Sequence, residues 1–143
     1  MLSKVLIGNR GEVACRVIRT LRRMGVASVA VYSDADRAAP HVAMADEAVL
    51  LGSAPPHESY LRIDAVLEAA RSTGADAIHP GYGFSAECGT FAEACTAAGL
   101  TWVGPTPAQL RLFTDKAAAR RLAQQQGIAL LPSSGPLRDA AHA

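Results

Sequence analysis

The sequence predicts a single α/β domain with an open, mainly parallel β-sheet and helices on both faces. Short runs of apolar and β-branched residues alternate with longer segments of helical periodicity, a pattern typical of such a sheet. The length of 143 residues is that of about one domain. A hydrophobic fraction of 50% excludes an intrinsically disordered chain.

The first predicted elements lie in the N-terminal third. Lys4–Gly8 is an apolar run that enters a polar turn, as expected of a strand. The segment 12–24 predicts a helix that ends at Gly25, because four apolar residues recur at spacings of four, four and three. Ser28–Ser33 is β-branched and apolar and predicts a second strand. The four residues of the helical face are Val13, Val17, Leu21 and Met24.

The middle of the chain is less regular. Ala48–Leu51 predicts a short strand that leads into a proline-containing loop. Ser59 is expected to cap a helix that ends at Gly74, because serine favours this position and apolar residues follow at helical spacing. Ala75–His79 predicts the next strand. The apolar face of the helix comprises Tyr60, Ile63, Leu67 and Ala70.

The last part changes character after a Gly-Pro pair at 104–105. Before the pair, Glu87–Ala98 predicts a helix and Leu100–Val103 a strand; after it, Pro107–Phe113 and Asp115–Gln126 predict two further helices. We therefore expect two regions, a Rossmann-like domain over 1–105 and a helical connector over 106–143.

Charge and cysteine content exclude several classes of protein. Lys and Arg number 14 against 13 Asp and Glu, so no basic excess is available for nucleic acid or a membrane surface. A membrane span needs ~20 apolar residues, and no run approaches that length. Cys15, Cys88 and Cys95 lack metal-ligand spacing and are expected to be buried or half-buried free thiols. With no secretory signal in sight, the chain is predicted to be cytoplasmic.

Candidate binding residues follow the predicted strands, because ligands bind at the carboxyl ends of parallel strands. These ends carry Asn9–Glu12, Ser33–Asp34 and His79–Gly83. Neither G-x-G-x-x-G nor G-x-x-x-x-G-K-[ST] is present, which disfavours a dehydrogenase and a P-loop NTPase.

Two of these turns allow a structural and a functional interpretation. In the first turn, Asn9 either caps the helix, with Glu12 favouring the positive end of its dipole, or Arg10 faces an anionic ligand or another domain. In His79–Gly83, two glycines beside Tyr82 make either a tight turn or a flat wall that a ligand approaches closely.

Two basic features of the sequence also allow both a structural and a functional interpretation. Arg16, Arg19 and Arg23 share one helix face, which is either solvated, with a Glu12–Arg16 pair, or a docking surface. Lys116 is either solvated or binds phosphate.

Five segments resemble the N-terminal part of biotin carboxylase, the ATP-grasp component of biotin-dependent acyl-CoA, pyruvate and urea-type carboxylases. They lie in the family's order and cover nearly the whole chain. They are residues 5–14 (VLIGNRGEVA), 30–37 (AVYSDADR), 59–61 (SYL), 77–84 (AIHPGYGF) and 113–117 (FTDKA).

The resemblance implies an activity and a set of partners. The family's reaction is ATP-dependent carboxylation of biotin on a carrier protein, in which bicarbonate is the substrate and carboxyphosphate the intermediate. The implied partners are the ATP-grasp and C-terminal domains, the biotin carboxyl carrier protein, a carboxyltransferase and a second copy in a homodimer. The ATP lid, the Mg²⁺ ligands and the bicarbonate-binding residues of the family would lie beyond position 143. We therefore expect no catalytic residue or metal ligand in this chain, and no activity of the chain alone.

The resemblance also assigns roles to single residues. It implies that Tyr82 and Gly83 line the biotin pocket, that Glu87 lies near the same cleft and that Lys116 contacts ATP phosphates. It places Arg16 and Arg19 at the homodimer interface. At Arg23 the family often has an acidic residue, so like-charge repulsion is expected to weaken that interface.

The chain departs from the family beside the predicted pocket. Ser85, Ala86 and Cys88 replace residues of a usual Leu-Ser-Glu-Asn segment, whereas Glu87 is retained. These changes leave an alternative open, a stand-alone binding or assembly module that keeps the fold without the chemistry. Gly8 replaces a usual alanine, a change expected to be harmless.

Overall fold

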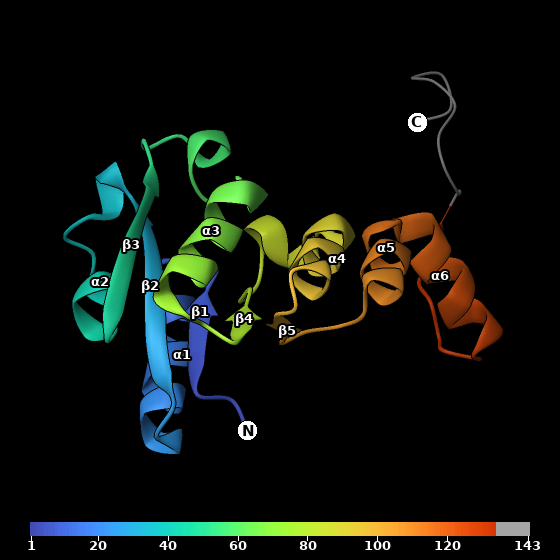
Figure 1. Cartoon of the computed structure of the whole chain (residues 1–143). Coiled ribbons are helices and arrows are strands. Elements are labelled where there is room, and N and C mark those ends of the chain that lie inside the picture. The colour runs from blue at the N-terminus through green and yellow to red at the C-terminus, as the bar shows by residue number, and fades with distance from the viewer. Residues whose placement is uncertain (134–143) are drawn as a thin grey trace.

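The computed structural model describes residues 1–133 and contains a five-stranded sheet in the order β3-β2-β1-β4-β5. All four strand pairings are parallel, which confirms the predicted fold class. Figure 1 shows the sheet at one end of the molecule and the C-terminal helices at the other. The strands are β1 (Lys4–Ile7), β2 (Ala27–Ser33), β3 (Glu47–Gly52), β4 (Ala77–His79) and β5 (Thr101–Trp102).

Helices cover both faces of this sheet because side chains alternate along each strand. Val5 and Ile7 of β1 pack with Ile18 of α1 on one face, whereas Leu6 packs with Val66 of α3 and with α4 on the other. The helices are α1 (Gly11–Met24), α2 (Pro40–Met44), α3 (Ile63–Thr73), α4 (Gly89–Ala97), α5 (Pro107–Thr114) and α6 (Lys116–Gln125). Three short 3₁₀ turns lie at Asp34–Asp36, Pro56–Glu58 and Phe84–Glu87.

The structure corrects several predicted helix details. The prediction that Ser59 caps a helix is wrong, since α3 begins at Ile63 and the Ser59 hydroxyl donates to the carbonyl oxygen of Pro55. In α1, Met24 is exposed and Ile18, which the predicted face omitted, is fully buried. α2 was not predicted, because five residues are too few to show a helical period.

The C-terminal helices leave the sheet after β5. Thr106 begins α5 with a capping box that includes Gln109. Asp115 begins α6, where its carboxylate accepts hydrogen bonds from the amides of Ala117 and Ala118. α5 lies beside α4, and α6 lies beyond it, away from the sheet (Figure 1). The boundary at 105 stays a prediction, and residues 134–143 of the predicted connector lie outside the described residues.

Within the described part of the chain, no helix is long and apolar enough to cross a membrane.

Candidate functional site

The loops that follow β1 and β4 meet at one edge of the sheet. In the order β3-β2-β1-β4-β5, β1 is paired with β2 on one side and with β4 on the other. The chain therefore changes direction across the sheet between β1 and β4. Such a switch point is where open α/β sheets bind their ligands, outside the carboxyl ends of the strands.

Asn9 joins these two loops. Its side chain is 3% exposed, and its amide nitrogen donates to the carbonyl oxygens of Pro80 at 2.8 Å and Tyr82 at 2.9 Å. Its side-chain oxygen accepts from the backbone amide of Arg10. The interpretation of Asn9 as the helix cap is therefore wrong: Arg10 takes the cap position of α1 without a side-chain bond, and Asn9 holds the β4 loop instead.

Gly81 allows the close contact between Asn9 and the loop after β4 because it lacks a side chain. Its φ is +69°, and an added Cβ would lie 2.8 Å from the Asn9 side-chain nitrogen. Its amide donates to Nδ1 of His79 at 3.0 Å. Burial lowers the pKa of His79 below the usual value, which keeps the ring neutral and Nδ1 available as an acceptor.

A cleft of about 340 Å³ opens between the two loops. Tyr82 is 62% exposed at its edge, and its hydroxyl donates to the carboxylate of Glu12. This hydrogen bond and the Glu12 charge raise the pKa of Tyr82. Glu12 forms no ion pair with Arg16 among residues 1–133, so the predicted pair is wrong. The cleft is lined by Asn9, Arg10, Gly11, Glu12, Val13, Tyr82, Gly83 and Phe84.

Phe84, at the end of the loop after β4, has an uncommon backbone conformation. Phe84 has a φ of +45°, the one positive value of a residue other than glycine in the described chain. For a bulky residue this conformation costs about 1–3 kcal/mol and persists only where surrounding contacts hold it. The Phe84 ring stacks on Tyr60, with 5.6 Å between the ring centroids.

A charged group faces that stack. The Arg10 guanidinium carbon lies 5.4 Å from the Phe84 ring centroid and 5.7 Å from that of Tyr60. Nη1 of Arg10 lies 3.2 Å from Oδ2 of Asp36. Asp36 and Tyr60 were not predicted as site residues; the acidic turn after β2 was the available signal.

Asp36 is ionised in this setting. Burial raises its pKa, but hydrogen bonds from Tyr60, Arg10 and Ser33 and the Arg10 charge outweigh burial, so the pKa lies below its usual value. Burial and the bond to Asp36 raise the pKa of Tyr60 to about 12. The hydroxyl of Tyr60 thus stays protonated and donates to Asp36 at 2.7 Å.

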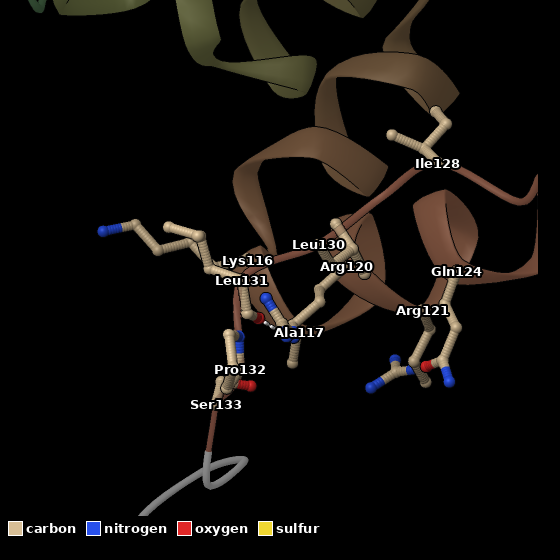
Figure 2. A pocket seen from close by; sticks show the side chains of 10 residues that line it. All are labelled: Lys116, Ala117, Arg120, Arg121, Gln124, Ile128, Leu130, Leu131, Pro132 and Ser133. Atoms are coloured by element: carbon tan, nitrogen blue, oxygen red, sulfur yellow. Dashed lines mark hydrogen bonds between the residues drawn. The ribbon is translucent and has the colours of Figure 1, made fainter.

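The other predicted site residues lie apart from this cleft. Glu87 lines a hollow of about 430 Å³ together with Cys88 and Arg111. Lys116 lines a larger hollow of about 1070 Å³ between α6 and the segment 128–133. Figure 2 shows the Lys116 side chain extending away from Arg120 and Arg121. The structure therefore brings Tyr82 and Gly83 together and places Glu87 and Lys116 elsewhere.

The predicted arginine stripe lies on the solvent side of α1. Arg16, Arg19 and Arg23 are exposed, and none of the three pairs with a carboxylate in the part of the chain that is described. The neighbouring Arg22 donates to the carbonyl oxygen of Met44. The stripe is thus an exposed positive surface with no described acidic partner.

The three cysteines are free, as predicted. Cys15 and Cys95 are buried and Cys88 is half-buried; burial raises the pKa of Cys95 to about 12. Among residues 1–133, no group of three or more His, Cys, Asp or Glu side chains could hold a metal ion.

A sequence model of the biotin carboxylase N-terminal domain matches residues 1–110. The chain belongs to this family. The α subunit of a mitochondrial methylcrotonoyl-CoA carboxylase from Oryza sativa subsp. japonica is 56% identical over 131 residues, 92% of this chain and 18% of the relative. A biotin carboxylase from Pseudomonas aeruginosa is 50% identical over 138 residues, 96% of this chain and 31% of the relative. The chain thus spans about a fifth to a third of the length of these relatives.

Solved structures of the family have the same fold. The biotin carboxylase domain of a single-chain bacterial carboxylase gives a TM-score of 0.90 at 45% identity, over 97% of this chain and 32% of that one. A biotin carboxylase domain dimer of the Hydrogenobacter thermophilus 2-oxoglutarate carboxylase gives 0.90 at 42% identity, over 99% and 31%. That structure contains MgADP, ADP and bicarbonate.

Proposed function

We propose that this chain forms the N-terminal lobe of a biotin carboxylase, which carboxylates carrier-bound biotin with ATP and bicarbonate. The observation that carries the proposal is the cleft beside Tyr82 and Gly83 at the β1–β4 switch point of a family member. ATP would phosphorylate bicarbonate to carboxyphosphate and ADP. Carboxyphosphate would release phosphate and CO₂, and a ureido nitrogen of biotin would take up the CO₂ and lose its proton.

In this proposal Tyr82 and Gly83 bind biotin. The exposed Tyr82 ring offers an apolar wall for a flat bicyclic ligand. Gly83 adopts φ +65° and ψ −170°, a conformation that leaves glycine as the suitable residue and exposes the backbone to the cleft. Glu87 lies in the neighbouring hollow, so any effect of Glu87 on biotin would pass through the Phe84–Glu87 turn.

Lys116 binds ATP phosphates in this proposal. An ammonium group is a compact point charge that suits a polyphosphate. Its extension away from the other basic side chains of α6 leaves it free to meet a nucleotide held by a second domain (Figure 2). Phosphoryl transfer would also need Mg²⁺, which would supply positive charge to offset that of the phosphates. Because the chain spans only about a fifth to a third of the length of its relatives, we expect the chain alone to be inactive.

The proposal includes the partners of a complete carboxylase. They are an ATP-grasp and a C-terminal domain, a biotin carboxyl carrier protein and a carboxyltransferase. A homodimer would use the stripe of Arg16, Arg19 and Arg23, and the enzyme would be cytoplasmic.

The departures from the family pattern lie outside the cleft. Ser85 and Ala86 are 6% and 8% exposed and point into the fold rather than into the cleft. The Ser85 hydroxyl donates to the backbone oxygen of Tyr60. The changed residues thus leave the walls of the cleft intact.

A chimera tests the function. We would replace the aligned segment of the Pseudomonas aeruginosa biotin carboxylase, 50% identical over 138 residues, with this chain. We expect phosphate release from ATP that requires both bicarbonate and biotin. Lys116→Ala should raise the KM for ATP and lower the rate by on the order of 100-fold, as loss of one electrostatic contact to a transition state does. A folded chimera without biotin-dependent turnover would contradict the proposal, and unchanged ATP kinetics in the variant would contradict the role of Lys116.

A further inference from the structure

Arg10 is half-exposed and lies between a carboxylate and two stacked aromatic rings. On one side Nη1 lies 3.2 and 3.4 Å from the two carboxylate oxygens of Asp36. On the other side the guanidinium faces the stacked rings of Tyr60 and Phe84. A guanidinium is planar and stacks on aromatic faces while it pairs with a carboxylate, which suits this position.

These contacts are anchored in the core rather than at the surface. Tyr60 is 2% exposed, and its hydroxyl donates to Asp36 at 2.7 Å and accepts from the amide of Ser33 at 3.1 Å. Asp36 also accepts from the Ser33 hydroxyl. The end of β2 therefore fixes Asp36 and Tyr60, and these two fix the plane of the guanidinium.

The same contacts hold one end of the β4 loop. Asn9 binds the loop at the Pro80 and Tyr82 carbonyls, but no side chain bonds to Gly83 or Phe84 among the described contacts. Phe84 is held by its ring, on Tyr60 and Arg10, although its backbone is in the left-handed region. The ring contacts therefore act together with the Ser85–Tyr60 hydrogen bond and the backbone bonds of the turn to keep a φ of +45° at Phe84.

We propose that Arg10 is a positioning residue for the biotin site: with Asp36 and Tyr60 it holds the Phe84 ring, and through it the Tyr82–Gly83 wall. This inference rests on the proposed function of the cleft. Arg10 lines the cleft and is half-exposed, but its guanidinium pairs with Asp36 and faces two rings, so we assign its role to the loop rather than to the ligand. The sequence left open a different role, an arginine that binds an anion, and the two roles predict different kinetics.

The first test measures the loop directly in the 143-residue chain. In Arg10→Met, which keeps an apolar stem and loses the guanidinium, the amides of Ala86 and Cys88 should exchange hydrogen at least several-fold faster. These amides donate to Gly83 and Ser85 across the turn. Arg37→Met is the matched control, since Arg37 also pairs with a carboxylate, Asp34, and lies 5.7 Å from a tyrosine ring. Equal exchange in Arg10→Met and the unchanged chain would overturn the inference, whatever the chain's activity.

The second test uses the chimera. Arg10→Met should raise the KM for biotin by on the order of tenfold and leave the KM values for ATP and bicarbonate within about twofold, because only the biotin wall is displaced. Arg10→Lys should restore part of the loss, since lysine keeps the charge without the planar stack. Arg37→Met should match the unchanged chimera.

Two results would overturn the inference in this assay. A rise in the KM for bicarbonate or ATP that equals or exceeds the rise for biotin would make Arg10 an anion-binding residue. An unchanged KM for biotin would show that the contacts of the Phe84 ring do not affect the biotin site. If the unchanged chimera shows no biotin-dependent turnover, the proposed function fails, and faster exchange in Arg10→Met alone would still support the role of Arg10 in the loop.

Discussion

Gly8 and Gly81, near the carboxyl ends of β1 and β4, differ in whether the structure can accommodate a side chain. A Cβ added at Gly81 would lie 2.8 Å from the Asn9 side chain, and the φ of +69° disfavours any other residue. A Cβ added at Gly8 would meet the Phe91 ring at 3.7 Å, an ordinary contact, which agrees with the expectation that replacing the family's alanine is harmless.

We therefore predict opposite effects of the same substitution at these glycines. Gly81→Ala should lower the free energy of unfolding by about 1–3 kcal/mol, because it adds backbone strain and a clash. Gly8→Ala should raise it by about 0.4–1 kcal/mol, since alanine restricts the unfolded chain. Urea unfolding at one pH measures both values, with each variant serving as the control for the other. A loss of stability in Gly8→Ala would show that the Phe91 contact is too tight.

Tyr82 gives a prediction about the ligand. In the chimera, Tyr82→Ala should raise the KM for biotin more than the KM for ATP, because the aromatic wall is lost. Tyr82→Phe keeps the wall and removes the bond to Glu12, so its KM for biotin should remain within about twofold of the unchanged value. Steady-state kinetics with each substrate varied in turn measure the effect. Equal changes for biotin and ATP in Tyr82→Ala would argue against a role of Tyr82 in the pocket.

Residues of the site were predictable where their chemistry is visible in a short stretch. Tyr82 and Gly83 stand out because glycines flank an aromatic ring after a strand. Asp36 and Tyr60 do not stand out, because their roles arise from a hydrogen bond between residues 24 positions apart. The acidic turn after β2 marks Asp36 as a candidate, but no local pattern in the sequence pairs it with Tyr60.

At the scale of elements, α6 depends on its N-cap residue, Asp115, more than the other long helices depend on theirs. It has no fully buried residue, and isolated helices shorter than ~12–15 residues are marginal in water. The Asp115 carboxylate satisfies two amides of the first turn and places Lys116 at the start of the helix.

Removing that cap should weaken α6. We predict that Asp115→Ala costs about 0.5–2 kcal/mol of helix stability and speeds amide exchange over residues 117–120, whereas Asp115→Asn costs much less. Hydrogen exchange measured residue by residue in both variants checks this, with the amides of α1 as an internal reference. Equal protection in Asp115→Ala and the unchanged chain would show that packing alone holds the helix.

Strands were easier to predict than helix starts. The five strands follow from apolar runs. The inner strands β1 and β2 are buried and need apolar residues on both faces, whereas the edge strands β3 and β5 are partly exposed. The start of α3 was misplaced since Tyr60, which fits the helical period, is buried by its contacts with Ser33 and Asp36 instead. The predicted helix at Glu87 begins two residues later, at Gly89, because Phe84–Glu87 forms a 3₁₀ turn.

At the scale of the whole molecule, two histidines couple stability to pH. Burial lowers the pKa of both His41 and His79 below 6.5. For His41, the Val31 carbonyl and Asp36 oppose this shift and the Arg10 charge adds to it. Among the described residues, Nδ1 of His41 has no hydrogen-bond partner, so the native state has no group ready to receive a second N–H.

We predict that the free energy of unfolding falls as the pH is lowered from about 7.5 to 5. In this range the unfolded chain binds protons at both histidines before the native state does, so stability is fully present about one pH unit above 6.5 and is lost as the pH falls through 6.5. Carboxylates with lowered pKa values titrate at lower pH and do not contribute. Urea unfolding at constant ionic strength measures the decline. A constant free energy over this range would contradict the prediction.

The different burial of the three thiols allows a fluorescent label to be placed selectively beside the Phe84–Glu87 turn. Cys15 and Cys95 are buried and Cys88 is half-buried at the end of the Phe84–Glu87 turn. A maleimide dye added to the native protein would therefore label Cys88 first, without any engineered cysteine. Its emission would report rearrangement of the turn as biotin or a second domain arrives, and so give the kinetics of assembly in real time.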